Sequence, residues 1–250
     1  MLRFTLLSCL FVCIFSIKRP HTRVVIAPIG ENQKTYCGFL ANPAISVLAG
    51  VGPAGCGKTV FACNAAVASL SKGDIDKMVI TRPIVSVDED LGFLPGTIAH
   101  KMDPWLRPIF DSLGEFYSPT EISKMMESGV IEIAPLAYMR GRTFKRTFVI
   151  ADEMQNSSIN QMLMILTRIG TGSKIVITGD LRQSDRSGAN GLADFYARLK
   201  RNPEDDEIKL VEFGSGDIQR SKVVSTILAM YEAPVKKVST DAALIPKDLL

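Results

Sequence analysis

The run at residues 52–59, Gly-Pro-Ala-Gly-Cys-Gly-Lys-Thr, constrains the fold of this chain more than any other feature. It matches the pattern G-x-x-x-x-G-K-[ST], in which glycines let successive backbone N–H groups curl around nucleotide phosphates. The lysine of such a loop reaches the β- and γ-phosphates, and the hydroxyl reaches Mg²⁺. An apolar stretch precedes the run and an amphipathic one follows it, as a strand-loop-helix unit requires. The predicted phosphate-binding residues are Gly52, Pro53, Ala54, Gly55, Cys56, Gly57, Lys58 and Thr59.

The composition is that of an ordinary globular protein. Of 250 residues, 46% are hydrophobic and 22% are charged, which is enough to bury one large α/β core. The 29 Lys and Arg residues against 26 Asp and Glu leave a net charge of +3, which is too small an excess to indicate nucleic-acid binding by itself. The five cysteines are odd in number and lack paired spacing, so they favour a reducing compartment over a disulfide framework or a zinc site.

An apolar stretch lies near the N-terminus, at residues 4–17, with Arg3 before it and the basic run 18–23 after it. It is shorter than the roughly 20 residues that span a bilayer, and no clear small-residue cleavage site follows it. A signal or organelle-targeting presequence, a short membrane anchor and a buried segment all remain open. Because the phosphate loop needs ATP, we expect a cytoplasmic protein, or one of an organelle matrix if the stretch is a presequence. Membrane contact is expected only if it is an uncleaved anchor.

From residue 25 onward, short apolar runs alternate with amphipathic stretches, which predicts βα units around a largely parallel sheet. Strands are expected at 45–51, 77–81, 130–134, 148–151, 174–178 and 208–213. Helices are expected at 58–72, 118–127 and 158–169, and a further one is expected to begin at Asp217. This predicts one α/β domain over residues 25–235, preceded by the hydrophobic segment 1–24 and followed by a polar tail at 236–250.

Polar side chains follow two of the expected strands. Asp152 and Glu153 close the strand 148–151, an arrangement in which one carboxylate holds Mg²⁺ and the next orients an attacking water. The next strand ends at Gly179-Asp180, and Gln183 beyond it supplies an amide to read the γ-phosphate. Ligands of open α/β sheets sit at the carboxyl ends of the strands. We therefore expect these side chains and the phosphate loop to meet in one crevice.

Five motifs together resemble the PhoH-like ATPases. They occupy residues 52–59, 82–96, 134–143, 152–156 and 178–180. The runs Leu-Gly-Phe-Leu-Pro-Gly and Ala-Pro-Leu-Ala-Tyr-Met-Arg-Gly-Arg within them belong to few other phosphate-loop proteins, and the resemblance covers about residues 28–233. It implies a RecA-like core, with a mostly parallel sheet flanked by helices on both faces. It also implies ATP hydrolysis with Mg²⁺ and kinship with superfamily 1 helicases.

The resemblance assigns roles to five residues of the expected crevice. Lys58 and Thr59 are expected to bind phosphate and Mg²⁺, with Asp152 as the second protein ligand of the metal. Glu153 is expected to orient the water, and Gln183 to contact the γ-phosphate. Catalysis is therefore expected from Lys58, Glu153 and Gln183, and metal binding from Thr59 and Asp152.

Two further residues have roles implied by the resemblance alone. Gln33 looks like the adenine-reading glutamine of the wider group, although a glutamine in a loop is usually solvated. Arg220 resembles a late arginine that neutralises charge on the γ-phosphate, although a helix-surface ion pair would also explain it. Cys56 replaces the threonine that is usual in this family's loop. Since a helix N-terminus lowers a thiol's pKa, we hypothesise that alkylation or oxidation of Cys56 blocks nucleotide binding, the alternative being a tolerated small residue.

The chain is long enough for one RecA-like lobe, whereas a translocating helicase grips its nucleotide between two. A homo-oligomeric ring, to which the resemblance also points and in hexameric form, would place the site at subunit junctions. Arg220, Arg140 or Arg142 would then reach a neighbour's phosphate, and for Arg140 and Arg142 contact with nucleic acid or with solvent is an equal alternative. The leading hypothesis is a helicase-like ATPase with single-stranded RNA or DNA as effector. The alternatives are a nucleotide-gated regulatory module with little turnover and, more weakly, a small-molecule kinase with Glu153 as base.

Overall fold

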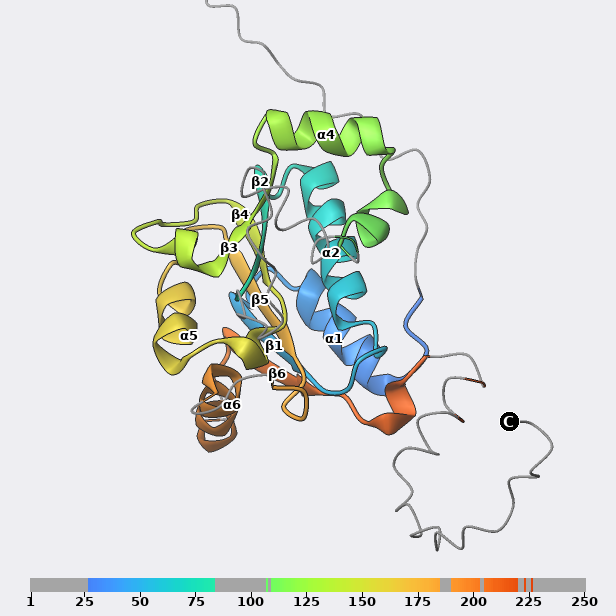
Figure 1. Cartoon of the computed structure of the whole chain (residues 1–250), viewed down its shortest axis with the longest axis vertical. Coiled ribbons are helices and arrows are strands. Elements are labelled where there is room, and N and C mark those ends of the chain that lie inside the picture. The colour runs from blue at the N-terminus through green and yellow to red at the C-terminus, as the bar shows by residue number, and fades with distance from the viewer. Residues whose placement is uncertain are drawn as a thin grey trace, which may run out of the picture.

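The computed structural model in Figure 1 describes residues 27–83, 107, 109–184, 190–202, 205–219, 223 and 226. Six strands form one sheet in the order β3-β2-β4-β5-β1-β6, and every neighbouring pair is parallel. They are β1 (Val47–Val51), β2 (Lys77–Arg82), β3 (Ile131–Pro135), β4 (Thr147–Ala151), β5 (Lys174–Gly179) and β6 (Ile208–Glu212). All six expected strands are present, so the predicted α/β class is confirmed.

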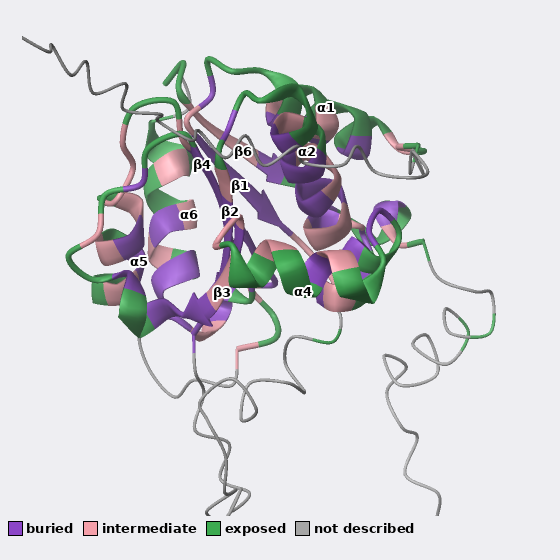
Figure 2. Ribbon diagram, turned by 90° about the horizontal axis from the view of Figure 1, so that it is seen from above, coloured by how far each residue is buried: buried purple, intermediate pink, exposed green. Residues whose placement is uncertain are grey.

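Helices cover both faces of the sheet, as Figures 1 and 2 show. One face carries α1 (Glu31–Ala41), α2 (Lys58–Lys72) and α4 (Pro119–Glu127). The other carries α5 (Ile159–Leu166) and α6 (Gly191–Arg201), together with the 3₁₀ turns η1 (Leu136–Met139) and η2 (Met154–Asn156). A third 3₁₀ turn, η3 (Ser215–Asp217), follows β6. The prediction of helices on both faces is therefore confirmed.

The strands separate two hydrophobic cores. In β4, Phe148 and Ile150 pack in the core beneath α1 and α2, while Val149 and Ala151 pack beneath α5 and α6. Successive side chains of a strand point to opposite faces, so a strand buried on both sides reads as a continuous apolar run. That is why these strands are visible in the sequence, and Figure 2 shows them enclosed between the two helical layers.

Capping explains where two helices begin. Ser118 caps α4 and shares reciprocal hydrogen bonds with Glu121, and Ser158 does the same with Gln161 at the start of α5. The expected end of α5 at residue 169 is wrong, because the helix stops at Leu166. Beyond that point the carbonyl oxygen of Arg168 accepts a hydrogen bond from the backbone N–H of Phe144, which draws the chain out of the helix.

The helices α1 and α6 were not expected from the sequence. The segment around Gln33, expected to be a loop, is the first turn of α1, and α6 begins at an Asn190 cap whose side chain accepts two backbone hydrogen bonds. Asp217, expected to open a helix, ends η3; residues 223 and 226 are helical, and the rest of the expected helix beyond residue 219 lies outside the described residues. Only Gln33, Tyr36 and Leu40 of α1 are buried, so the apolar periodicity that announces a helix is weak there.

The predicted N-terminal segment 1–24 and tail 236–250 lie outside the described residues, as does the run 84–96. Within the part of the chain that the structure describes, no helix has the length and apolar character needed to cross a membrane.

A buried lysine closes the end of α1. The Lys174 ammonium donates hydrogen bonds to the carbonyl oxygens of Phe39, Leu40 and Asn42 at 2.9, 2.8 and 2.7 Å. Burial lowers the pKa of Lys174 to about 8, so the group remains mainly charged at neutral pH. The last carbonyls of a helix have no partner within it, and this side chain satisfies them from β5.

Replacing this lysine is expected to loosen α1 from the sheet. We expect Lys174→Met to lower the free energy of unfolding by about 1–3 kcal/mol, because three carbonyl oxygens lose their donor. Lys72→Met, at the exposed end of α2, is the control and is expected to change it by less than about 0.5 kcal/mol. Urea unfolding of both variants measures the difference. Equal effects would contradict a capping role for Lys174.

Candidate functional site

The carboxyl ends of β1, β4 and β5 meet at one edge of the sheet. A hollow of about 130 Å³ lies there. It is lined by Ala54, Gly55, Lys58, Thr59, Asp152, Glu153, Gly179, Asp180 and Gln183. β5 lies between β1 and β4, so the segment after β5 enters between the phosphate loop and the acidic pair. The structure thus brings together the loop, both carboxylates and Gln183, as the sequence predicts.

The phosphate loop leaves β1 through a glycine that no other residue could replace. Gly52 has φ of 152°, and a Cβ there would lie 2.4 Å from the carbonyl oxygen of Phe213. The loop can therefore pass against the segment that follows β6 only without a side chain. It ends at Gly57, the residue before α2, so the amino end of α2 opens at the hollow, where a helix favours anions.

Lys58 is held by the loop to which it belongs. Its ammonium donates to the carbonyl oxygens of Gly52 and Pro53, both at 2.7 Å, and the residue is 8% exposed. Burial lowers the pKa of Lys58, and nearby acidic groups, including Asp180 and Glu153, act in the opposite direction. The ammonium is therefore placed where phosphate oxygens could replace its two carbonyl acceptors.

Asp152 is the most connected side chain of the crevice. It is 2% exposed, and its carboxylate accepts hydrogen bonds from Thr59 Oγ1 at 2.9 Å, from the Thr178 hydroxyl and from Arg82 Nε at 2.9 Å. A buried carboxylate is costly unless it is paired and hydrogen-bonded, and here both conditions are met. The Arg82 ion pair at the end of β2 was not expected from the sequence. A charged residue that closes an apolar strand, the signal that identified Asp152, would have identified Arg82 too.

The donors around Thr59 and Asp152 fit a magnesium ion. A hydroxyl and a carboxylate lie 2.9 Å apart and present the hard oxygen ligands that Mg²⁺ prefers. Among the described residues, no group of three or more His, Cys, Asp or Glu side chains could hold a metal by itself. Mg²⁺ commonly takes one or two protein ligands and shares its remaining positions with phosphates and water.

Glu153 sits at a strained corner. It has φ of 54° and ψ of 37°, the left-handed region that residues other than glycine avoid, and its side chain is exposed. Such strain costs on the order of 1–3 kcal/mol and clusters at functional sites. Its carboxylate accepts a hydrogen bond from Gln155 Nε2 at 2.5 Å. Gln183, also exposed, lies beyond a turn in which its N–H donates to the carbonyl oxygen of Asp180 at 3.2 Å.

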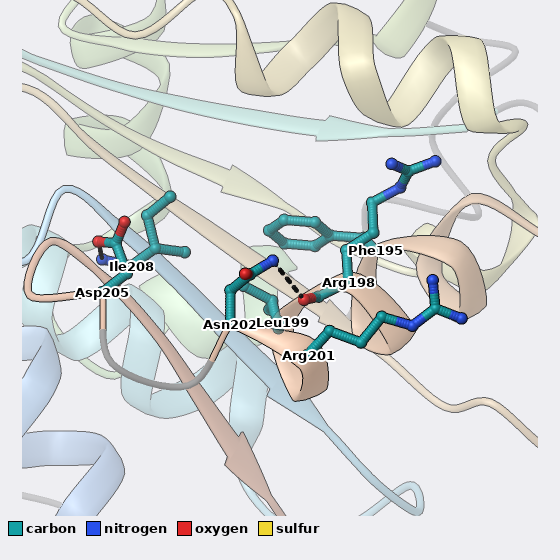
Figure 3. A pocket seen from close by; sticks show the side chains of 7 residues that line it. All are labelled: Phe195, Arg198, Leu199, Arg201, Asn202, Asp205 and Ile208. Carbon is teal, nitrogen blue, oxygen red and sulfur yellow. Dashed lines mark hydrogen bonds between the residues drawn. The ribbon is translucent and has the colours of Figure 1, made fainter.

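Two larger hollows lie at the opposite edge of the sheet, where β1 and β6 begin. One, of about 650 Å³, is shown in Figure 3. It is lined by Phe195, Arg198, Leu199, Arg201, Asn202, Asp205 and Ile208. The other is about 480 Å³ and adjoins it. Figure 3 shows the guanidinium groups of Arg198 and Arg201 extending from α6 away from Asp205 and Ile208. These hollows are larger than the crevice, but no residue of the phosphate loop lines either of them.

A family model described as PhoH-like protein matches residues 25–232. The chain belongs to the PhoH-like protein family. The PhoH-like proteins of Mycobacterium tuberculosis (strain ATCC 25618 / H37Rv) and Bacillus subtilis (strain 168) are 44% and 46% identical to it over 84% and 73% of its length. Protein PhoH of Escherichia coli (strain K12) is 42% identical over 72%. The matches cover 59%, 57% and 51% of these relatives, so the chain spans little more than half their length.

A solved structure agrees with the fold of this PhoH-like chain. The large terminase of a thermophilic bacteriophage, in its second crystal form, gives a TM-score of 0.52 at 10% identity, covering 84% of this chain and 52% of that one. At this identity the likeness concerns the fold alone. The PhoH-like chain thus carries its phosphate loop on a six-stranded parallel sheet.

The PhoH-like chain uses Gln33 as a structural connector. The side chain is 1% exposed, and its Oε1 accepts hydrogen bonds from Ile29 N and Gln219 Nε2, both at 2.8 Å. Its Nε2 donates to the carbonyl oxygens of Cys56 and Asp217, both at 3.3 Å. Gln33 thereby ties α1 to the phosphate loop and to η3. Adenine recognition would require it to exchange some of these partners, and that role stays a prediction.

Of two further residues singled out in the sequence, the PhoH-like structure describes Cys56 but not Arg220. The Cys56 thiol is completely buried and lies 3.8 Å from the carbonyl oxygen of Gly214, as a donor to it. An alkylating reagent would therefore need the loop to open, and the effect of such labelling stays a prediction. Arg220 lies outside the described residues.

The structure distinguishes Arg140 from Arg142, which the sequence leaves equivalent. The Arg142 guanidinium donates to both oxygens of Glu132, at 2.5 and 2.9 Å, and lies 5.0 Å from the centroid of the Phe144 ring. Lys77 forms a second ion pair with Glu132 at 2.5 Å. Arg140 is exposed, and its side chain makes no hydrogen bond or ion pair within the described part of the chain. Arg142 thus stabilises the fold through Glu132, whereas Arg140 is exposed.

The Glu132 cluster is expected to give the PhoH-like chain an acid-sensitive contribution to stability. Hydrogen bonds from Arg142, followed by the other contacts to Arg142 and Lys77, lower the pKa of Glu132 to about 2. A carboxylate with a depressed folded-state pKa stabilises the fold above its unfolded-state value, near 4.5, and loses this as pH falls toward 2. At pH 6 we expect Glu132→Gln to lower the free energy of unfolding by about 1–2 kcal/mol, since solvent screens a partly exposed cluster.

At pH 3 we expect a smaller difference in the free energy of unfolding between the wild-type protein and Glu132→Gln. Urea unfolding of the wild-type protein and Glu132→Gln at both pH values measures it, and Glu127→Gln, at an exposed position at the end of α4, is the control. A difference that does not change with pH would contradict this account of Glu132.

Proposed function

We propose that this PhoH-like chain hydrolyses ATP with Mg²⁺, and that hydrolysis is coupled to binding or remodelling single-stranded RNA or DNA. One observation carries the proposal of hydrolysis: an exposed carboxylate, Glu153, shares a single crevice with the loop lysine and with the Thr59–Asp152 pair. A loop that only bound phosphate would not require a second carboxylate held in a strained corner beside it.

Each residue of the crevice has a distinct task in this proposal. Lys58 transfers its ammonium from loop carbonyls to phosphate oxygens. Thr59 and Asp152 hold the metal, and Mg²⁺ when bound neutralises charge on the phosphate oxygens. Glu153 orients the attacking water and takes up its proton. Gln183 lines the same crevice, and in this proposal its amide contacts the γ-phosphate.

Nucleic-acid coupling is supported by a polar and aromatic pair on the same edge of the sheet. Tyr138 in η1 is 55% exposed, and the exposed Arg140 follows at the end of the same turn, beyond the carboxyl end of β3. Single-stranded nucleic acid is bound by aromatic rings that stack on bases and by cations that contact the backbone. A homo-oligomeric ring, hexameric by resemblance, remains part of the proposal, with Arg220 then facing a neighbour's phosphate.

A second candidate is a nucleotide-gated module with little turnover. Three observations favour it. The crevice is small, the Lys58 ammonium is hydrogen-bonded to its own loop, and the Asp152 carboxylate is paired with Arg82. Such a module would bind ATP and change its partner affinity without releasing phosphate, which the same assay distinguishes.

Substitution of two crevice residues tests hydrolysis directly. We expect Lys58→Ala to abolish turnover by weakening ATP binding. We expect Glu153→Gln to lower kcat by about 10²- to 10⁴-fold while ATP still binds, because only the group that orients the water is altered. Phosphate release and ATP binding are measured on the full chain, with Lys72→Ala and Glu127→Gln as exposed controls. If Glu153→Gln releases phosphate like the wild-type protein, the assignment of Glu153 is wrong.

Substitution of Arg140 tests whether ATP hydrolysis is coupled to nucleic-acid binding. We expect Arg140→Ala to reduce the stimulation of ATPase activity by single-stranded RNA and to lower the salt dependence of RNA binding by about one phosphate contact. ATPase activity without RNA should not change. Lys145→Ala, which removes another exposed cation further along the same connection, is the control. If Arg140→Ala instead lowers activity without RNA and dissociates an oligomer, Arg140 acts at a subunit junction and the nucleic-acid role is contradicted.

A further inference from the structure

The left-handed backbone conformation of Glu153 is unfavourable, so contacts with neighbouring residues must stabilise it. Among the described residues, only Glu153 and Arg146 combine a positive φ with a side chain. Arg146 is fixed by hydrogen bonds to Asp76 and to the carbonyl oxygen of Gly73. Residues in this region persist only where their surroundings over-determine them. The neighbours of Glu153 should therefore include a comparable restraint.

Gln155 is that restraint. It is 2% exposed, and both ends of its amide are used. Nε2 donates to Glu153 Oε2 at 2.5 Å, and Oε1 accepts from the backbone N–H of Asp180 at 3.2 Å. A flipped amide would set an oxygen against a carboxylate and an NH₂ group against an N–H, so the two partners fix its orientation. Gln155 thereby connects Glu153, which follows β4, to Asp180, which follows β5.

The surrounding residues leave Gln155 no other position. A Cβ at Gly179 would lie 2.5 Å from Gln155 Oε1 and 2.6 Å from Leu192 Cδ2, so β5 must end in glycine for the amide to reach Asp180 N. The Ser184 hydroxyl donates to the carbonyl oxygen of Gln155 at 3.2 Å. The side chain is thus enclosed by β5, α6 and the segment after β5.

We propose that Gln155 is the positioning residue for Glu153. Its amide holds Oε2 of the carboxylate without giving it a proton, and Oε1 accepts no hydrogen bond from the described residues. One oxygen is therefore anchored, and because Glu153 lines the crevice, its other oxygen can receive a proton from water there. This role rests on the proposed hydrolysis of ATP, and it links the carboxylate after β4 to the strand that leads to Gln183.

Two substitutions of Gln155 separate the halves of the amide. Gln155→Glu keeps an acceptor for Asp180 N but replaces the donor to Glu153, and Gln155→Met removes both contacts at similar volume. We expect each to lower kcat by about 10- to 100-fold, part of what a positioned general base contributes, with KM for ATP changed less than about twofold. Ser157→Ala is the control: it removes a buried hydrogen bond to Met154 O, within the same turn, without touching Glu153. It should leave kcat per folded molecule unchanged.

A double-mutant cycle tests whether Gln155 acts through Glu153. In the Glu153→Gln background, single-turnover rates should not fall further when Gln155→Met is added, because the group being positioned is already gone. A residue with only a structural role would lower the rate equally in both backgrounds. Persistence of the full effect in the Glu153→Gln background would overturn the proposal, as would wild-type kcat in both Gln155 variants.

A second cycle, on unfolding in urea, separates this proposal from the proposed function. The effects of Glu153→Ala and Gln155→Met on the urea midpoint should be non-additive, because each change alone removes the one hydrogen bond that the two side chains share. If the wild-type protein binds ATP but releases no phosphate while this coupling is present, the proposed ATPase function fails and the contact stands. Additive effects on the midpoint would show that the contact does not operate and would overturn the positioning role.

Discussion

The buried carboxylate of Asp152 is the interaction on which the rest of the site depends. It is almost excluded from water, yet it receives donors from the start of α2, the end of β2 and the end of β5. An isolated charge in that position would be prohibitively costly, and removing one partner of a buried pair is more damaging than never forming it. The carboxyl ends of the strands are therefore held in register by a polar cluster as well as by the apolar sheet below.

This arrangement divides the crevice into a rigid part and a strained part. Asp152 and Thr59 are fixed by mutual hydrogen bonds on elements of the core. Glu153, one residue further, turns out of the strand into a left-handed corner and is held by a side chain from the following turn. Adjacent carboxylates in the sequence thus have different surroundings, one buried and paired with Arg82 and the other exposed. Different surroundings are what allow neighbouring carboxylates to perform different tasks.

Much of this could be predicted from the sequence, because the determining signals are local. Strands buried on both faces read as apolar runs, capping boxes mark α4 and α5, and the phosphate loop is defined by its own spacing. Residues that close neighbouring strands then had to meet at one edge. The family of the chain followed from several such motifs in order.

What the sequence could not supply were contacts between distant segments. That β2 lies beside β4, so that Arg82 meets Asp152, depends on strand order, which no local pattern encodes. The sequence predicts a loop at Gln33 because α1 buries few apolar side chains, and the partners of Gln33 come from the phosphate loop and from η3. Likewise, the sequence does not distinguish Arg140 from Arg142, whereas in the structure only Arg142 donates hydrogen bonds to Glu132 of β3.

The contacts of Lys58 have a thermodynamic consequence. Two of the three donors of its ammonium already have acceptors, so a phosphate bound there as proposed would replace existing hydrogen bonds as well as use the third donor. In that proposed role the lysine would contribute to selectivity, because a ligand offsets the broken contacts only if it brings enough negative charge to outcompete two neutral carbonyls. Weakly charged ligands would then compete poorly with the backbone of the resting loop.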